Sequence, residues 1–301
     1  MPSGLPGWSS RRSLKLANRS YRVANDNRLH LMSLQMVALR AGALAGALLL
    51  AGCGTLASGR TWGQDATPRP GWERVGWAAK RAILDPGTWA PAAGAAVTGA
   101  GGFDRTISDW TRRRNPIFGS AAAADSASSA ILGGLRVAAI GSALATPSGT
   151  EAGDWAVSKV KGLAVEWAAS GATTLSVDAL KSVTGRTRPN ASDDRAFPSS
   201  HASAAFLAAT LLSRNLDSIE IRDSLRVVLR VGAYSAAGTA AWARVEAQAH
   251  YPSDVLAGAA LGHFLGSFVR DAFLGLPDGR GPEIEVVPTE KGAMVVFTFS
   301  F

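Results

Sequence analysis

Alanine-rich segments interrupted by prolines dominate the chain between residues 73 and 274. Alanine has the highest helix propensity, proline ends helices, and runs of β-branched residues are rare in this region. The interrupting prolines are Pro86, Pro91, Pro116, Pro147 and Pro189. The sequence therefore predicts an all-α fold, a helical bundle. Its expected helices cover residues 73–84, 90–100, 104–114, 124–145, 154–184, 199–214, 219–242 and 252–274.

The length of 301 residues is enough for one large helical core with additional segments at both ends. We expect the helical domain over residues 73–280. Its longest stretches without Asp, Glu, Lys or Arg cover residues 86–103 and 196–213, and both contain prolines. A membrane-spanning helix needs about 20 apolar residues. The sequence therefore predicts that no helix of this domain crosses a membrane.

Residues 281–301 follow a different pattern, in which apolar side chains recur at every second position around a turn at 288–292. These side chains are Ile284, Val286, Val295, Phe297, Phe299 and Phe301. The alternation favours a β-hairpin, which we expect to pack on the helices. A terminal Phe after alternating aromatic residues is also found in the last strand of outer-membrane barrels. One hairpin cannot close a barrel, so the packed hairpin is the preferred interpretation.

Cys53 is the only cysteine, and it ends the sequence Leu-Ala-Gly-Cys after the small, apolar residues 41–51. This resembles a bacterial lipoprotein signal, in which the cysteine is acylated and becomes the mature N-terminus. Residues 1–52 would then be a signal peptide, and its long polar start suggests a misassigned extension with translation beginning at Met32 or Met36. A buried helix that ends in Ala-Gly-Cys is the alternative.

Residues 53–72 would follow as the lipidated cysteine and a flexible tether rich in Gly, Ser, Thr and Pro. Such a stretch reaches roughly 60 Å when extended. Residues 1–52 hold seven Lys or Arg and one Asp, so the remaining chain carries 24 basic and 22 acidic side chains. We therefore expect no nucleic-acid partner, because such a domain keeps a clustered basic face. The oligomeric state stays open.

Three blocks in the second half of the chain carry the chemistry. The first is Lys181 with Arg188-Pro189, the second is Pro198-Ser199-Ser200-His201, and the third is Arg244 with His250 and Asp254. Pro198 and Pro252 each suit the first turn of a helix, where unpaired backbone N–H groups attract anions. Three cations, a hydroxyl and two helix starts would together form a site for one oxyanion.

The order and spacing of these blocks resemble the type 2 phosphatidic acid phosphatase and vanadium haloperoxidase superfamily, over the 74 residues from Lys181 to Asp254. The chain departs from the family pattern at Ser200, where the family has Gly, and at Ala243, where it has Ser. A backbone N–H is available from either residue at position 200. Ala243 cannot supply the hydroxyl of its counterpart, so some support for the pocket would be lost.

The resemblance implies a role for each site residue. The phosphate oxygens would be held by Lys181, Arg188, Arg244, Ser199 and Ser200. His250 would be the nucleophile that forms a phosphohistidine, and Asp254 would fix its tautomer. His201 would protonate the leaving oxygen and then activate water. No metal or other cofactor is implied, and His263 is expected to be a packed helix residue.

The leading hypothesis is a metal-independent phosphatase for phosphate monoesters or diphosphates, including lipid phosphates. We expect it to be anchored by lipid in the bacterial cell envelope, at the outer membrane and facing the periplasm. A vanadate-dependent haloperoxidase and an inactive envelope lipoprotein are the alternatives. Residues 190–197 should border the pocket, where Asp193 and Asp194 would repel a second anionic group.

Overall fold

The computed structural model describes residues 52–56, 58–275, 283–289 and 292–298. The predicted signal peptide and the alternative starts at Met32 and Met36 lie outside these residues, as do the loop and the end of the predicted hairpin. The helices are α2 (Trp72–Leu84), α3 (Pro86–Ala100), α4 (Phe103–Arg114), α5 (Ala121–Ala145), α6 (Ala152–Thr184), α7 (Ser200–Leu216), α8 (Asp223–Glu246) and α9 (Pro252–Val269), which continues as the π-helical turn η1 (Arg270–Leu274). The predicted all-α fold is confirmed.

The start of α3 and both ends of α8 each differ by four residues from the predicted boundaries. Pro86 occupies the first turn of α3, and the Asp85 side chain caps that helix by accepting from the Gly87 N–H at 2.9 Å. Proline is tolerated in this turn because its missing N–H would have no helical partner. Helix α3 therefore begins four residues before the predicted start and includes Pro91.

Two strands follow the helices, β1 (Glu283–Thr289) and β2 (Gly292–Thr298). They pair antiparallel, with Glu283 opposite Thr298 and Thr289 opposite Gly292. The predicted packing of this hairpin on the helices lies outside what the structure describes.

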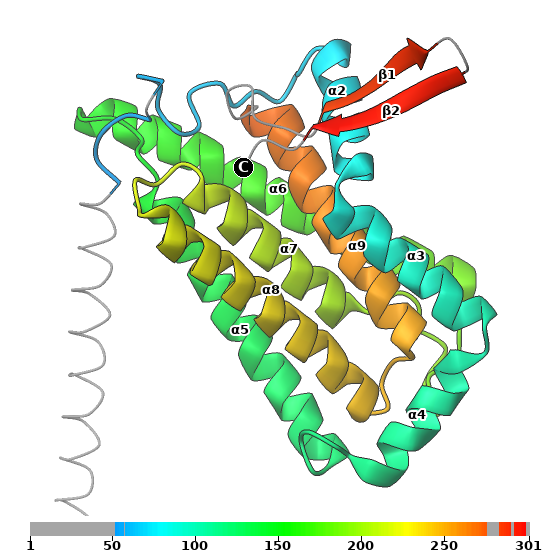
Figure 1. Cartoon of the computed structure of the whole chain (residues 1–301). Coiled ribbons are helices and arrows are strands. Elements are labelled where there is room, and N and C mark those ends of the chain that lie inside the picture. Colours follow the sequence, from blue (N-terminus) through cyan, green and yellow to red (C-terminus); the bar gives the residue numbers. More distant parts are fainter. Residues whose placement is uncertain (1–51, 57, 276–282, 290–291, 299–301) are drawn as a thin grey trace, which may run out of the picture. The chain divides into compact units, whose positions relative to one another are not determined.

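Helix α9 is the central helix of the domain. It packs against α7 on one side and α3 on another, and it also contacts α2 and α6. Helices α5, α7 and α8 lie side by side (Figure 1). The main apolar cluster includes Leu132, Val165, Leu207, Leu211 and Val269, contributed by α5, α6, α7 and α9.

Glycines on one face of α9 allow α7 to approach closely. A Cβ atom on Gly262 would lie 2.1 Å from the Ser203 carbonyl oxygen, and one on Gly258 would lie 2.6 Å from that of Ser199. Both distances are far shorter than a van der Waals contact, so only glycine fits. This close approach brings the N-terminal end of α7 next to that of α9.

Several residues in 52–56 and 58–67 are hydrogen-bonded to the helical domain, whereas the composition predicts a flexible tether. Gly54 forms a two-way β-bridge with Gly149 in the loop between α5 and α6, with N–O distances of 3.1 and 2.8 Å. The Trp62 ring is buried, and it occupies the space that a side chain on Gly162 of α6 would fill. Composition predicts a tether because residues 53–72 are rich in Gly and Ser. One buried apolar residue such as Trp62 hardly changes that composition.

Helix α5 is long and apolar enough to cross a membrane, judged by length and composition alone, and a third of its most apolar window is buried in the fold. It is the one such helix among the described residues. The sequence prediction overlooked it because Asp125 and Arg136 interrupt the charge-free run. One helix of this kind also occurs in the cores of proteins that do not cross a membrane, so the expectation that no helix of this domain spans one stays a prediction.

We predict that Gly262→Ala destabilises the fold by about 1–3 kcal/mol, the usual cost of overpacking a core. Gly133→Ala is the matched control, because Gly133 lies in α5 with nothing within 4 Å of an added Cβ atom. Glycine in a helix interior is less stable than alanine by about 0.5–1 kcal/mol, so the control should gain stability. Thermal unfolding followed by circular dichroism measures both. Equal stability of the two variants would contradict the close approach of α7 and α9.

Candidate active site

The three sequence blocks meet at one end of the helical domain. Lys181 lies in the last turn of α6 and Arg244 in the last turn of α8, whereas His201 and Asp254 lie in the first turns of α7 and α9. Ser199 at the start of α7 donates its backbone N–H to the Asp254 carbonyl oxygen at 3.0 Å. The two helix starts that the sequence predicts to form an anion pocket are therefore in direct contact.

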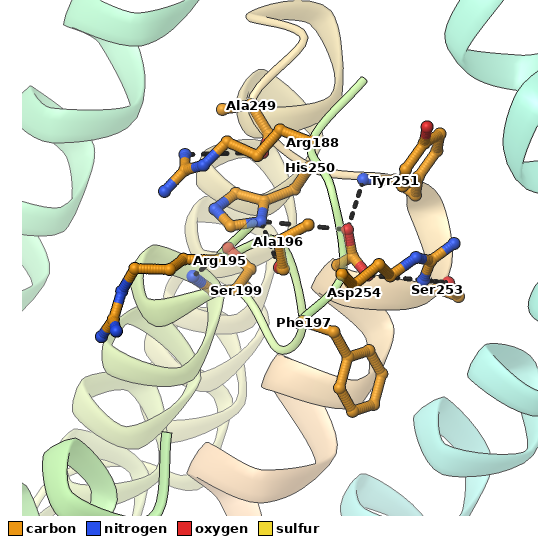
Figure 2. A network of polar contacts seen from close by, with 12 residues as sticks. Arg188, Arg195, Ala196, Phe197, Ser199, Ala249, His250, Tyr251, Ser253 and Asp254 are labelled. Atoms are coloured by element: carbon orange, nitrogen blue, oxygen red, sulfur yellow. Dashed lines mark hydrogen bonds and ion pairs between the residues drawn. The ribbon is translucent and has the colours of Figure 1, made fainter. Parts of the chain in front are cut away.

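His250 lies just before α9 with its ring almost completely buried, at 1% exposure. Its Nδ1 lies 2.7 Å from the backbone carbonyl oxygen of Ala196 (Figure 2). A carbonyl oxygen can only accept, so Nδ1 carries the proton and Nε2 keeps its lone pair. Burial lowers the pKa of His250 well below its ordinary value, and Arg188 lowers it further. The ring is neutral, as a nucleophile must be.

Asp254 does not orient His250 in the way the resemblance implies. Its Oδ2 is 3.9 Å from the His250 Nδ1 and accepts instead from the Tyr251 N–H at 2.8 Å. Its Oδ1 accepts from Arg186 at 2.6 Å. Burial raises the pKa of Asp254 to about 6. The Ala196 carbonyl therefore fixes the tautomer of His250, while Asp254 caps α9 and pairs with Arg186.

The three predicted phosphate-binding cations lie around His250, and all three lower its pKa. Lys181 is 6% exposed, and burial lowers its own pKa. Arg188 donates from Nε to Asp193 at 2.6 Å, and Arg244 pairs with Asp125 of α5. Both carboxylates are largely exposed, so a bound phosphate can replace them on the arginines.

Arg244 carries a further indication of an anion site. Its Nε is buried and has no hydrogen-bond partner among the described residues, although the same guanidinium pairs with Asp125 through Nη1. An unpaired buried donor on a charged group is costly, since it has lost its water. A phosphate oxygen would satisfy such a donor.

Ser199 and Ser200, at the start of α7, differ in what they can offer a phosphate. Ser199 is fully buried, and its hydroxyl accepts from the Ala202 N–H at 3.4 Å as the helix cap. Its backbone N–H is used by Asp254, so it is not available to a phosphate. Ser200 is the first residue of α7 and its side chain is exposed, so it does not narrow the buried part of the pocket. The amides of Ser200 and His201 are the free donors expected at this helix start.

His201 is half-buried beside the cations. Burial lowers its pKa to about 4, and Arg244 lowers it further, while Asp125 acts in the opposite direction. His201 is therefore neutral at pH 7 without a ligand. A phosphate dianion next to Arg244 and Lys181 would offset their charge and raise the pKa of His201 toward the range in which a general acid works.

Three further residues at the site were not among the sequence candidates. Asp125 pairs with Arg244, and Arg186 and Asp104 form an ion pair of 2.6 Å next to Asp254. Arg186 lies two residues before Arg188, yet a lone arginine in a turn carries no pattern of its own. The two aspartates lie on α4 and α5, far from the motifs along the chain, and no spacing rule connects them to the site.

The remaining sequence candidates lie apart from the phosphate pocket or have no polar group to offer it. Ala243 is fully buried and leaves the pocket without the hydroxyl of its counterpart. His263 is buried in α9 with Nε2 3.1 Å from Asp85, which confirms that it packs within the fold. Cys53 is exposed near Gly149, at the opposite end of α6 from Lys181. In the part of the chain that the structure describes, no group of three or more His, Cys, Asp or Glu could hold a metal ion.

Comparison with known proteins agrees with the motifs. Residues 163–274 match the family model of the PAP2 superfamily. A crystal structure titled the first transmembrane PAP2 type phosphatidylglycerolphosphate phosphatase from Bacillus subtilis is similar, with 20% sequence identity, a TM-score of 0.47 and coverage of 64% of this chain and 94% of that chain. No curated protein matches the chain. The match over 163–274 includes all three blocks and supports a phosphatase-type hydrolase of the type 2 phosphatidic acid phosphatase superfamily.

Proposed function

We propose that this protein is a metal-independent phosphatase that hydrolyses phosphate monoesters or diphosphates through a phosphohistidine intermediate. The observation that carries the proposal is the state of His250. Its Nδ1 proton is directed to the Ala196 carbonyl at 2.7 Å, so the Nε2 lone pair is available to attack. Three cations surround the same ring. A neutral imidazole within a cluster of positive charge suits attack on an anionic phosphoryl group.

The first step forms a bond between the His250 Nε2 and phosphorus while the bond from phosphorus to the leaving oxygen breaks. Lys181, Arg188 and Arg244 stabilise the negative charge on the other phosphoryl oxygens. His201 gives its proton to the leaving oxygen. In the second step His201 takes a proton from water, which attacks phosphorus and breaks the bond to Nε2. Inorganic phosphate leaves, and both histidines return to their starting state.

The protonation of His201 depends on whether a phosphate is bound. Without a ligand, burial and Arg244 keep this ring neutral, with a pKa of about 4. The negative charge of a bound phosphate favours its protonated form. His201 therefore takes up the proton it will donate when substrate is bound. The proton comes either from solvent or from the substrate, if the phosphate binds as a monoanion.

We further propose that the protein works at a membrane, attached through an acylated Cys53. Cys53 is exposed, and its neighbour Gly54 is bound to the domain at Gly149. Large apolar side chains are also exposed on α6, among them Trp167 at 79% and Val183 at 85%. Such a surface favours contact with lipid over contact with water. These features support a lipid phosphate as substrate. The outer membrane and its periplasmic side are proposed from the resemblance of the segment ending at Cys53 to a lipoprotein signal.

We predict that His250→Ala abolishes phosphoenzyme formation, because the variant lacks the buried imidazole that Lys181, Arg188 and Arg244 surround. The measurement is an alkaline quench of the protein mixed with a labelled phosphate ester, followed by detection of label on the protein. His263→Ala is the matched control, since His263 is a buried histidine of the same helix region outside the site. Label retained in His250→Ala would contradict the nucleophile. Halide oxidation by the vanadate-loaded protein would favour the haloperoxidase instead.

We predict that activity falls with rising pH at two different positions. In the free protein His201 has a pKa of about 4, so kcat/KM, which reports free protein, should fall from acidic pH upward. The bound phosphate raises that pKa, so the fall in kcat should lie at higher pH. His201→Ala should lose about 10²–10⁴-fold in rate and lose the basic limb of both profiles. The parent and the variant share the ionisation of the substrate, so a basic limb common to both belongs to the substrate. Identical basic limbs in the parent and the variant would contradict His201 as the acid.

We predict that the full-length protein incorporates a fatty acid at Cys53 and fractionates with membranes. Cys53→Ser should carry no label and accumulate as the unprocessed precursor. The thiol is replaced by a hydroxyl of similar size at an exposed position, so the fold and the hydrolysis of soluble esters should be unchanged. Metabolic labelling and fractionation measure the outcome. An unlabelled parent protein would overturn the anchor without affecting the phosphatase proposal.

A further inference from the structure

Asp104, on the first turn of α4, is the centre of a buried polar network beside the site. It is 4% exposed. Its Oδ1 accepts from the backbone N–H of Ser253 at 2.8 Å, and its Oδ2 accepts from the Ser253 hydroxyl at 2.5 Å and from Arg186 Nη2 at 2.6 Å. Three hydrogen bonds to one buried carboxylate fix the position of Ser253 in the first turn of α9.

Arg186 joins this carboxylate to a second one. Its Nη1 donates to the Asp254 Oδ1 at 2.6 Å and to the Ser253 hydroxyl at 2.8 Å, while Nη2 holds Asp104. Its guanidinium lies over the Tyr251 ring, 4.5 Å from the centroid. The planar guanidinium is suited to such bridging because its donors are fixed in one plane, whereas a lysine ammonium lacks that geometry.

The network is connected to the nucleophile through the backbone of the turn before α9. Asp254 accepts from the N–H of Tyr251, the residue that follows His250, at 2.8 Å. The Asp254 carbonyl accepts from the Ser199 N–H at 3.0 Å, at the start of α7. Asp254 therefore holds the turn before α9 through its carboxylate, which Arg186 neutralises, and the start of α7 through its backbone carbonyl (Figure 2).

The positive charge of Arg186 is needed because two buried carboxylates lie beside it. Asp104 and Asp254 are both buried, and Arg186 bridges them at 2.6 Å each. Without the guanidinium two carboxylates would face each other out of water, and one of them would take up a proton or move away. Either change would weaken the hydrogen bond from the Tyr251 N–H to Asp254. The His250 ring would then lose its fixed position.

We infer that Arg186 and Asp104 are positioning residues for the catalytic histidine, acting through Asp254 and Ser253 on the turn that carries His250. Asp104 lies outside residues 163–274, so the matched family segment depends on a side chain from α4 to complete its site. The inference rests on the proposed function, and it assigns Asp254 to this network instead of to direct contact with the His250 ring.

The test compares Arg186→Gln and Asp104→Asn with the parent protein in three measurements. These are the single-turnover rate of phosphoenzyme formation, the affinity for vanadate, and the pH dependence of that rate. Misplacing a nucleophile by about 1 Å costs on the order of 10²-fold in rate. We expect that loss in rate with a clearly smaller loss in vanadate affinity. A displaced His250 weakens its bond to vanadium, whereas the hydrogen bonds of the two replaced side chains do not include Lys181, Arg188 or Arg244, so those cations still hold the vanadate oxygens.

The pH profile separates positioning from general damage to the fold. The Asp254 pKa is about 6 in the parent, and Arg186 lowers it, so Arg186→Gln should move the acid limb of the profile to higher pH. The matched controls are Arg112→Gln and Asp109→Asn, which break an exposed Arg–Asp pair of 2.7 Å on the same helix α4. Both controls should retain the parent rate.

The outcomes distinguish this inference from the proposed function. A parent protein that forms no phosphoenzyme would overturn the proposed function itself. A parent that forms it, with folded Arg186→Gln reacting at the parent rate, would overturn the positioning role alone. An equal loss of rate and vanadate affinity would also overturn it, because the residue would then support the whole pocket. If Arg186→Gln does not fold, the near-isosteric Asp104→Asn decides by the same criteria.

Discussion

The contact between α7 and α9 is the interaction on which the rest of the structure depends. The glycines of α9 remove the side chains that would separate the two backbones, so a Cβ atom at Gly262 would meet Ser203 at 2.1 Å. At the end of this contact the two helix starts meet through the hydrogen bond from Ser199 to Asp254. Each helix start presents unpaired N–H groups to an anion. A fold that separated the helices by one methyl group would therefore also separate the parts of the pocket.

Two arginines of the site are paired with carboxylates that a substrate phosphate can replace. Arg188 and Arg244 each have an exposed carboxylate partner, Asp193 and Asp125. Lys181 and His250 are buried, and their charged forms are disfavoured. The free-energy cost of holding the two arginines in the site is moderate, because each has a carboxylate beside it. The exposed position of the two carboxylates makes the exchange for phosphate oxygens possible.

Most of the helical fold was predictable from the sequence, and the roles of the site residues stay predictions. Alanine-rich segments and prolines give the helices, and the spacing from Lys181 to Asp254 gives the family, which the match over 163–274 confirms. The contacts within the site were less predictable. The Ala196 carbonyl orients His250 through backbone geometry that side-chain identity does not encode. Asp104 and Asp125 act from helices that precede the motifs, and only the tertiary packing brings them to the site.

The bound segment after Cys53 determines what an anchor at that cysteine would do. Gly54 is bridged to Gly149 just before α6, and Lys181 lies in the last turn of that helix. Helix α6 has 33 residues and is therefore about 50 Å long at 1.5 Å per residue. A lipid on Cys53 would thus be attached to one end of a stiff rod whose other end bears the pocket. The tilt of this rod against the membrane, and not the length of a loose linker, would set the height at which the pocket meets phosphate groups.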